Sequence, residues 1–317
     1  MSKFKKVLAI SLILSFVNSC LSISASDTKF YEDVSLFTYD CNNGLVIEEV
    51  YTCMVNDTSV YSTPASQTAN SRSLVPGDGE GDSRFQVNAE LEPYSRVGDI
   101  YLEWDFEHDG IVDQITHSGT GFMVGPDVMM TAAHVVYWKD EAKWDANSVA
   151  TLNYFADTVY YVTKRNGEND YEEIAYSTNI TISQAYTTPV DTQNHDWAIV
   201  QLNTNVGDRT GWSNIGITNG SLNDNYFMVT GYPDDVGKKY SQWASTGFVE
   251  VTDSSLFWYA LDTSGGQSGA PVFDSLGTVW GIHIVGSVPR NGAYRFSTTV
   301  YGIVQQKITE SLERYPR

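Results

Sequence analysis

Short apolar segments separated by turn residues run through most of this 317-residue chain, and they limit the folds open to it. Ile100, Leu102 and Trp104 alternate with more polar neighbours, as expected for a strand with one buried face. Turn residues follow several such segments, as at Gly125–Asp127 and Tyr232–Asp235. Further strands are predicted at 122–124, 149–155, 197–202, 226–230, 247–251, 256–261 and 279–284.

Only one long helix is predicted, at the C-terminal end of the chain. Apolar residues recur there at helical spacing, with charged residues between them: Val300, Ile303, Val304, Ile308 and Leu312. Many short strands followed by a single terminal helix favour an all-β barrel or sandwich.

The acidic composition argues against two classes of partner. The formal net charge is -20 and the pI is near 4.4, so a nucleic acid or an anionic membrane surface would be repelled at long range. The ordinary consequence of such acidity is solubility. A site that accepts an acidic substrate must create its own local positive potential.

The N-terminus has the composition of a secretory signal. Three lysines precede an apolar run at residues 7–17, and small residues follow from Ser22 to Ala25. We therefore expect residues 1–25 to be a signal peptide and the protein to be secreted to the extracellular medium, with no membrane contact beyond export. The residues before Cys20 also resemble a bacterial lipobox, which leaves lipid anchoring as an alternative.

Residues 26–72 are polar and irregular, and they end in a run of small residues before Arg72. We expect a pro-segment here, with an activating protease cutting after Arg72. The alternative is an N-terminal extension that stays attached. Cys41 and Cys53 lie in this segment and are open to pairing or to remaining free, while no cysteine follows residue 53.

A glycine-rich stretch at Asp262–Phe273 supplies a candidate nucleophile, Ser268. Its glycines allow backbone N–H groups to point inward, so the N–H groups of Gly266 and Ser268 are candidate oxyanion donors. Tight turns use the same residues, so this stretch alone does not establish catalysis.

A serine nucleophile needs a histidine base and an acid that orients it. His134 follows an apolar strand and two alanines, and Asp196 precedes another apolar strand. Either residue taken alone fits a structural role, and His195 is a rival base.

Three motifs together resemble the trypsin-like serine proteases: Thr131–His134, Asp196–Val200 and Gly265–Val272. The nearest resemblance is to the bacterial glutamyl endopeptidases. It implies two six-stranded antiparallel β-barrels with the active site between them, followed by a C-terminal helix. In this chain these parts correspond to a protease domain at 73–317, with barrels at about 85–205 and 211–298 and a helix at about 298–314.

The resemblance also implies which residues select the substrate. Thr263, His283 and the amine of Ser73, released by cleavage after Arg72, would meet a glutamate carboxylate. The chain departs from the family pattern in the longer segment at 77–82 and in Ile284–Gly286 after the specificity histidine.

We therefore expect a secreted, monomeric serine endopeptidase that is made as a zymogen and cuts polypeptides after Glu, less readily after Asp. The triad would be His134, Asp196 and Ser268, with no cofactor and no metal. Two alternatives stay open. One is an exfoliative-toxin-like protease with a single folded target, and the other is an inactive protease fold that serves as a binding module.

Overall fold

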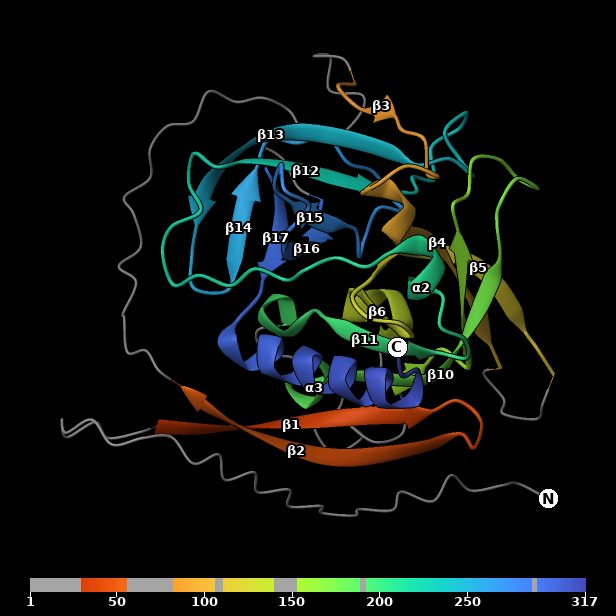
Figure 1. The fold of residues 1–317 in the computed structure, drawn as a ribbon, viewed down its shortest axis with the longest axis vertical. Coiled ribbons are helices and arrows are strands. Elements are labelled where there is room, and N and C mark those ends of the chain that lie inside the picture. The colour runs from red at the N-terminus through yellow and green to blue at the C-terminus, as the bar shows by residue number, and fades with distance from the viewer. Residues whose placement is uncertain (1–29, 56–81, 106–110, 140–152, 189–191, 287–289) are drawn as a thin grey trace.

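Two antiparallel β-barrels and a C-terminal helix make up the protein (Figure 1). The structure is a computed structural model that describes residues 30–55, 82–105, 111–139, 153–188, 192–286 and 290–317. The predicted signal peptide, Arg72 and Ser73 lie outside these residues.

The first barrel has six strands in the order β11-β6-β5-β4-β9-β10, and it closes because β10 also pairs with β11. Its strands are β4 (Val97–Trp104), β5 (Gln114–Met123), β6 (Val128–Thr131), β9 (Thr158–Thr163), β10 (Ile174–Ser183) and β11 (Ala198–Leu202). A short ribbon of β7 (Tyr137–Lys139) and β8 (Asn153–Phe155) accompanies this barrel.

The second barrel has six strands in the order β12-β15-β16-β17-β14-β13, closed by the pairing of β12 with β13. Its strands are β12 (Tyr226–Gly231), β13 (Trp243–Thr252), β14 (Leu256–Tyr259), β15 (Pro271–Phe273), β16 (Val279–Val285) and β17 (Asn291–Arg295). A two-residue strand, β3 (Phe85–Gln86), adds to the edge of β13. The predicted fold of two six-stranded barrels is confirmed.

The helices are short, apart from the last. They comprise the single turns α1 (Ala133–Val136) and α2 (Gly207–Thr210), the 3-10 turns η1 (Tyr94–Arg96), η3 (Gln184–Thr187) and η4 (Thr192–His195), and the terminal α3 (Thr298–Arg314). Ser297 caps α3 by accepting a hydrogen bond from the Val300 N–H at 3.2 Å. Two hydrogen bonds of 3.0 Å from Arg314 to the buried Asp127 fix its other end to the first barrel. No helix of the described residues is both long and apolar enough to cross a membrane.

A hairpin precedes the barrels and corrects one expectation. Residues 26–72 are predicted to have no regular secondary structure, but residues 30–55 form two paired strands, β1 (Phe30–Asp40) and β2 (Leu45–Val55). The two strands lie beside α3 (Figure 1). The register places Cys53 opposite Glu32, nine residues from Cys41 along β1. At about 3.3 Å per residue, this register sets the backbone positions of residues 41 and 53 far apart along the hairpin.

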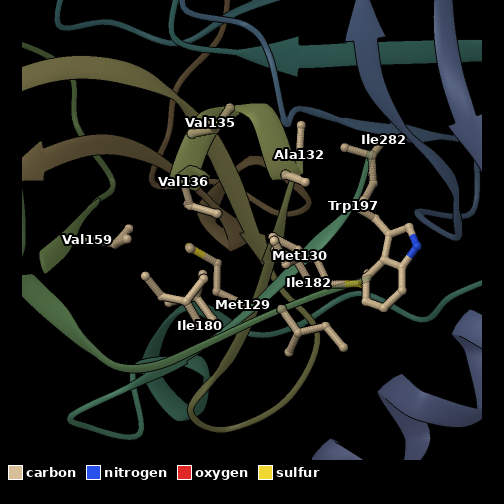
Figure 2. Close-up of a cluster of buried hydrophobic side chains, with 14 of the residues drawn as sticks. Met129, Met130, Ala132, Val135, Val136, Val159, Ile180, Ile182, Trp197 and Ile282 are labelled. Atoms are coloured by element: carbon tan, nitrogen blue, oxygen red, sulfur yellow. The ribbon is translucent and has the colours of Figure 1, made fainter. Parts of the chain in front are cut away.

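One cluster of buried apolar side chains includes residues of both barrels. Figure 2 shows Met130, Ala132 and Trp197 from the first barrel close to Ile282 from the second. All four side chains are at most 1 % exposed. These residues immediately precede or adjoin the predicted catalytic and specificity residues, so the core holds the site-bearing strand ends in fixed positions.

Candidate active site

His134 sits on α1, the single helical turn that follows β6. The residues before it, Ala132 and Ala133, are fully buried, whereas the His134 side chain is 35 % exposed. Small residues at this point bring the backbone close to its neighbours and leave the imidazole at the surface of the barrel.

Asp196 holds His134 through both carboxylate oxygens. One oxygen accepts a hydrogen bond from the backbone N–H of His134 at 2.9 Å, and the other lies 2.7 Å from ring nitrogen Nδ1. The pairing of β6 with β11, with Thr131 opposite Ala198, places the two residues side by side. A carboxylate only accepts hydrogen bonds, so Nδ1 carries a proton, and Nε2 has a lone pair whenever the ring is neutral.

The Asp196 carboxylate also governs the charge of the ring. Burial favours the neutral imidazole, but the adjacent negative charge outweighs this and raises the pKa of His134 above its usual value of 6.5. An imidazole of this kind takes up a proton readily. This is the property needed in a base that accepts a proton during a reaction.

Ser268 lies on the loop between β14 and β15, and its side chain is half-buried. Gly266 and Gly269 on either side have φ angles of +88° and +87°, the left-handed region that only glycine adopts freely. The Gly269 N–H donates to the His283 carbonyl at 2.8 Å, which ties the loop to β16. In the described part of the chain, no hydrogen bond joins Ser268 Oγ to the His134 ring.

Thr120 on β5 joins the nucleophile loop to the first barrel. Its N–H donates to the Ser268 carbonyl at 2.8 Å, and its hydroxyl donates to the Gly266 carbonyl at 2.9 Å. Its own carbonyl accepts a hydrogen bond from the hydroxyl of Thr131, the last residue of β6, at 2.8 Å. Because Thr120 is fully buried, these hydrogen bonds have no competition from water.

The peptide between Gly265 and Gly266 has a fixed orientation. The Gly265 carbonyl accepts a hydrogen bond from the Asp234 N–H at 2.8 Å. In a trans peptide the N–H points opposite to the carbonyl, so the Gly266 N–H is directed away from Asp234. Within the described residues, neither this N–H nor that of Ser268 donates to another protein group.

A buried arginine that was not singled out from the sequence supports the same loop. Arg84 donates to Ser264 Oγ at 2.8 Å and to Gln267 Oε1 at 3.3 Å, and it also forms ion pairs with Asp82 and Asp235. Its side chain is fully buried. Gln267 directly precedes Ser268, so Arg84 restrains the loop from behind.

His117 was also missed, and it fixes the turn that holds Gly265. Its two ring nitrogens each lie 2.7 Å from a carboxylate, one from Asp99 and the other from Asp234. Burial would lower the pKa of His117, but the two acids outweigh it and raise the pKa. With a carboxylate beside each ring nitrogen, His117 is a structural residue rather than a catalytic base.

The predicted specificity residues lie in the second barrel and are buried. Thr263 Oγ1 accepts a hydrogen bond from Asn291 Nδ2 at 2.9 Å, and His283 Nδ1 lies 2.8 Å from the Tyr259 hydroxyl. Asn291 and Tyr259 were not predicted, because an Asn-Gly pair indicates a turn and a strand tyrosine indicates core. Their register, Tyr259 opposite Asn291, sets both partners side by side beneath the loop.

His283 is neutral in this setting. Burial is the main reason that its pKa falls to about 3, and the nearby His134 lowers it further, while the Gly292 backbone offsets only part of this. The pKa of Tyr259 is raised well above 10 by burial, so its hydroxyl keeps its proton. His283 and Thr263 can therefore offer hydrogen bonds to a ligand, but His283 offers no positive charge.

Comparison with known proteins assigns the family. A model of the trypsin-like peptidase domain matches residues 119–282, which is more than half of the chain. The chain belongs to the trypsin-like peptidase family. A glutamyl endopeptidase from Bacillus licheniformis is 31% identical over 256 residues, covering 79% of this chain and 72% of that protein. The predicted resemblance of this trypsin-like peptidase to the glutamyl endopeptidases, and its nature as a serine endopeptidase, are confirmed.

Of two further relatives, one is also named a glutamyl endopeptidase and the other is not. A glutamyl endopeptidase from Staphylococcus aureus is 29% identical over 62% of this chain and 50% of its own length. A protein from Bacillus subtilis named extracellular metalloprotease is 30% identical over 78% of this chain and 75% of its own length. Among the residues that the structure describes in this peptidase, no group of three His, Cys, Asp or Glu side chains is placed to hold a metal ion. A solved structure of a Glu endopeptidase supports the fold, with a TM-score of 0.59 at 24% identity over 74% of this chain and all of that one.

Histidine titrations would test these charge states. By ring-proton NMR, we expect His134 to titrate above pH 6.5, and its pKa to fall in an Asp196→Asn protein.

In the same NMR experiment, His283 should show no titration from about pH 8 down to about pH 5. The unfolded chain binds a proton at this site more readily than the folded one, so His283 should cost stability as the pH falls from 6.5 toward 3. A His283 resonance that titrates near pH 6.5 would contradict its burial as a neutral ring.

Proposed function

We propose that this chain hydrolyses peptide bonds after glutamate, and less readily after aspartate, through a triad of Ser268, His134 and Asp196. The observation that carries the proposal is the His134–Asp196 pair. Both carboxylate oxygens are committed to His134, at 2.9 and 2.7 Å, so the neutral ring would have its lone pair on Nε2 and could act as base for the serine. This is the arrangement of base and orienting acid that a serine nucleophile requires.

In the proposed reaction, Ser268 Oγ attacks the carbonyl carbon of the substrate while His134 Nε2 accepts the hydroxyl proton. The resulting imidazolium is stabilised by Asp196 and then gives its proton to the leaving amine, which completes the acyl-enzyme. Water next attacks the ester with His134 again acting as base. The products are a new carboxyl terminus, a new amine and the original enzyme.

The oxyanion of the intermediate would be bound by the N–H groups of Gly266 and Ser268. The Gly265 carbonyl is fixed to Asp234, and the Gly266 and Ser268 carbonyls are fixed to Thr120. The intervening N–H groups therefore have set directions before substrate arrives. Donors that need no reorganisation during the reaction are the most effective in stabilising developing charge.

The glutamate preference is supported by the direction of the hydrogen bonds around Thr263 and His283. Asn291 donates to Thr263 Oγ1, so the threonine hydroxyl proton is left to donate to a ligand. Tyr259 can donate to His283 Nδ1, so the neutral ring can carry its proton on Nε2 and donate it as well. Two donors suit a carboxylate, and the amine of Ser73 would add the missing positive charge.

Export and zymogen processing complete the proposal. The lysine-flanked apolar run at the N-terminus supports secretion, and the run of small residues before Arg72 supports cleavage by another protease at that point. Hydrolysis of the Arg72–Ser73 bond by one water molecule would give a carboxylate at Arg72 and the amine at Ser73. The same cleavage would then activate the enzyme and give the pocket its positive charge.

Replacement of the nucleophile tests the reaction itself. A Ser268→Ala protein should hydrolyse peptide substrates at least about 10³-fold more slowly, because no acyl-enzyme can form. Ser264→Thr is a suitable control, since it keeps the hydroxyl that receives Arg84 and leaves the nucleophile in place. Full activity in Ser268→Ala would reject the proposed triad.

Replacement of a pocket donor tests the specificity. Thr263→Val keeps the shape but removes the hydroxyl, so kcat/KM for glutamyl substrates should fall about 10- to 100-fold, the cost of one hydrogen bond to a charged group. The control is Thr246→Val on β13, whose hydroxyl bonds to the exposed Tyr226 instead. Cleavage sites mapped by mass spectrometry in a denatured protein should follow Glu. Failure to cut short glutamyl peptides would favour the protease with one folded target, and cleavage mainly after Lys, Arg or aromatic residues would refute the pocket.

N-terminal sequencing of the secreted active form tests the processing step. We expect the sequence to begin at Ser73 and an Arg72→Ala protein to remain uncut and poorly active on glutamyl substrates. The loss in Arg72→Ala should be restored when a different protease site is placed to release the same Ser73 amine. A fully active, Glu-specific enzyme that begins near residue 26 would contradict the zymogen.

A further inference from the structure

The edge of β10 carries more hydrogen-bonding groups than the barrel itself uses. On one side β11 pairs with residues from Ser177 to Ile182. On the other side β9 pairs only with residues 174–176. The remaining edge, Asn179–Ser183, pairs with Leu36–Asp40 of the N-terminal hairpin. Without the hairpin, this edge would be unpaired and open to association with other chains.

Side chains of the hairpin belong to the barrel core. Leu36 and Tyr39 are 3% and 2% exposed and join the same apolar cluster as the strands of the first barrel. The Tyr39 ring stacks on Phe155 at a centroid distance of 5.3 Å, and its hydroxyl donates to Asp157 at 3.2 Å. The buried hydroxyl of Thr38 lies 2.9 Å from that of Thr181. Such burial is typical of a permanent interface.

One residue of the C-terminal helix, Gly302, lies directly against the hairpin. Gly302 lies inside α3, where glycine is the least favoured residue apart from proline. A Cβ atom at this position would come within 2.5 Å of the Tyr51 hydroxyl on β2. Figure 1 shows β1 and β2 lying beside α3. The helix sequence, which belongs to the protease domain, is thus shaped to receive the hairpin.

The proposed cut does not touch these contacts. The hairpin ends at Val55, and Arg72 follows 17 residues later. The hairpin residues that contact β10, the barrel core and α3 all precede Val55. We propose that the hairpin at residues 30–55 stays bound to the protease domain after the chain is cut, as a second, noncovalent chain. This rests on the proposed processing of the zymogen. The mature enzyme would then be a two-chain molecule in which the hairpin covers the β10 edge and packs on α3.

The retention can be measured without relying on the enzyme's own activity. In a Ser268→Ala protein with an affinity tag just before Phe30, residues 66–72 are replaced by the recognition sequence of an added site-specific protease. After the cut, the protease domain should remain on the affinity resin with the tagged hairpin and leave only in denaturant. A soluble protease domain in the flow-through would overturn the proposal. Since an external protease makes the cut, this result is independent of whether Arg72 is the natural site.

Two variants test the contact with α3. Gly302→Ala adds the methyl group that meets Tyr51, so the hairpin should dissociate roughly tenfold faster, a usual consequence of overfilling a packed contact. Tyr51→Phe removes the hydroxyl and should restore retention in the Gly302→Ala background. Val50→Ala, at a β2 position that is 48% exposed, is the matched control and should change nothing. Equal retention in Gly302→Ala and the parent, or an equal loss in Val50→Ala, would overturn the docking of the hairpin on α3.

Discussion

The hydrogen bonds of Thr120 are the interaction on which the assembled site depends. One buried residue of the first barrel binds the carbonyls of Ser268 and Gly266 from the second barrel, accepts the Tyr232 N–H, and receives the hydroxyl of Thr131. Strand β6, which leads to His134, and the loop that carries Ser268 are therefore both bonded to the same residue. Because Thr120 is fully buried, loss of any one of these bonds would leave an unsatisfied polar group in the core.

The charged groups near the site hold the nucleophile loop from its outer side, whereas the specificity residues are neutral. Arg84 and His117 lie against Asp235 and Asp234, hold the turn that these two residues form, and thereby fix the loop from outside. The proposed specificity residues are Thr263 and a neutral His283. In a chain of net charge -20, a glutamate side chain would meet donors there but no cation from these two residues. This is why the proposed specificity requires the Ser73 amine.

The motifs that the sequence revealed are local, and the features it concealed depend on distant partners. His134 and Ser268 were found because alanines and glycines stand within a few positions of them, and Asp196 was found because an apolar strand follows it directly. Arg84 was missed because its partners Asp235 and Ser264 lie 151 and 180 residues away. The hairpin was missed for a related reason. Polar residues alternate with apolar ones through β1 and β2. The burial of the hairpin's apolar side chains depends on β10 and α3, and no local sequence pattern indicates these distant partners.

The contacts of the uncut chain bear on what processing can change. Arg84, Thr120 and Asp234 already hold the nucleophile loop in the full-length chain, and none of their bonds involves a new N-terminus. The hairpin lies on β10 and α3, whereas His134 and Ser268 lie at α1 and on the loop between β14 and β15. Under the proposed function, cleavage therefore has neither a loop to order nor a hairpin to remove from the site. Its remaining effect is to supply the amine, so latency would reside in substrate binding rather than in the triad.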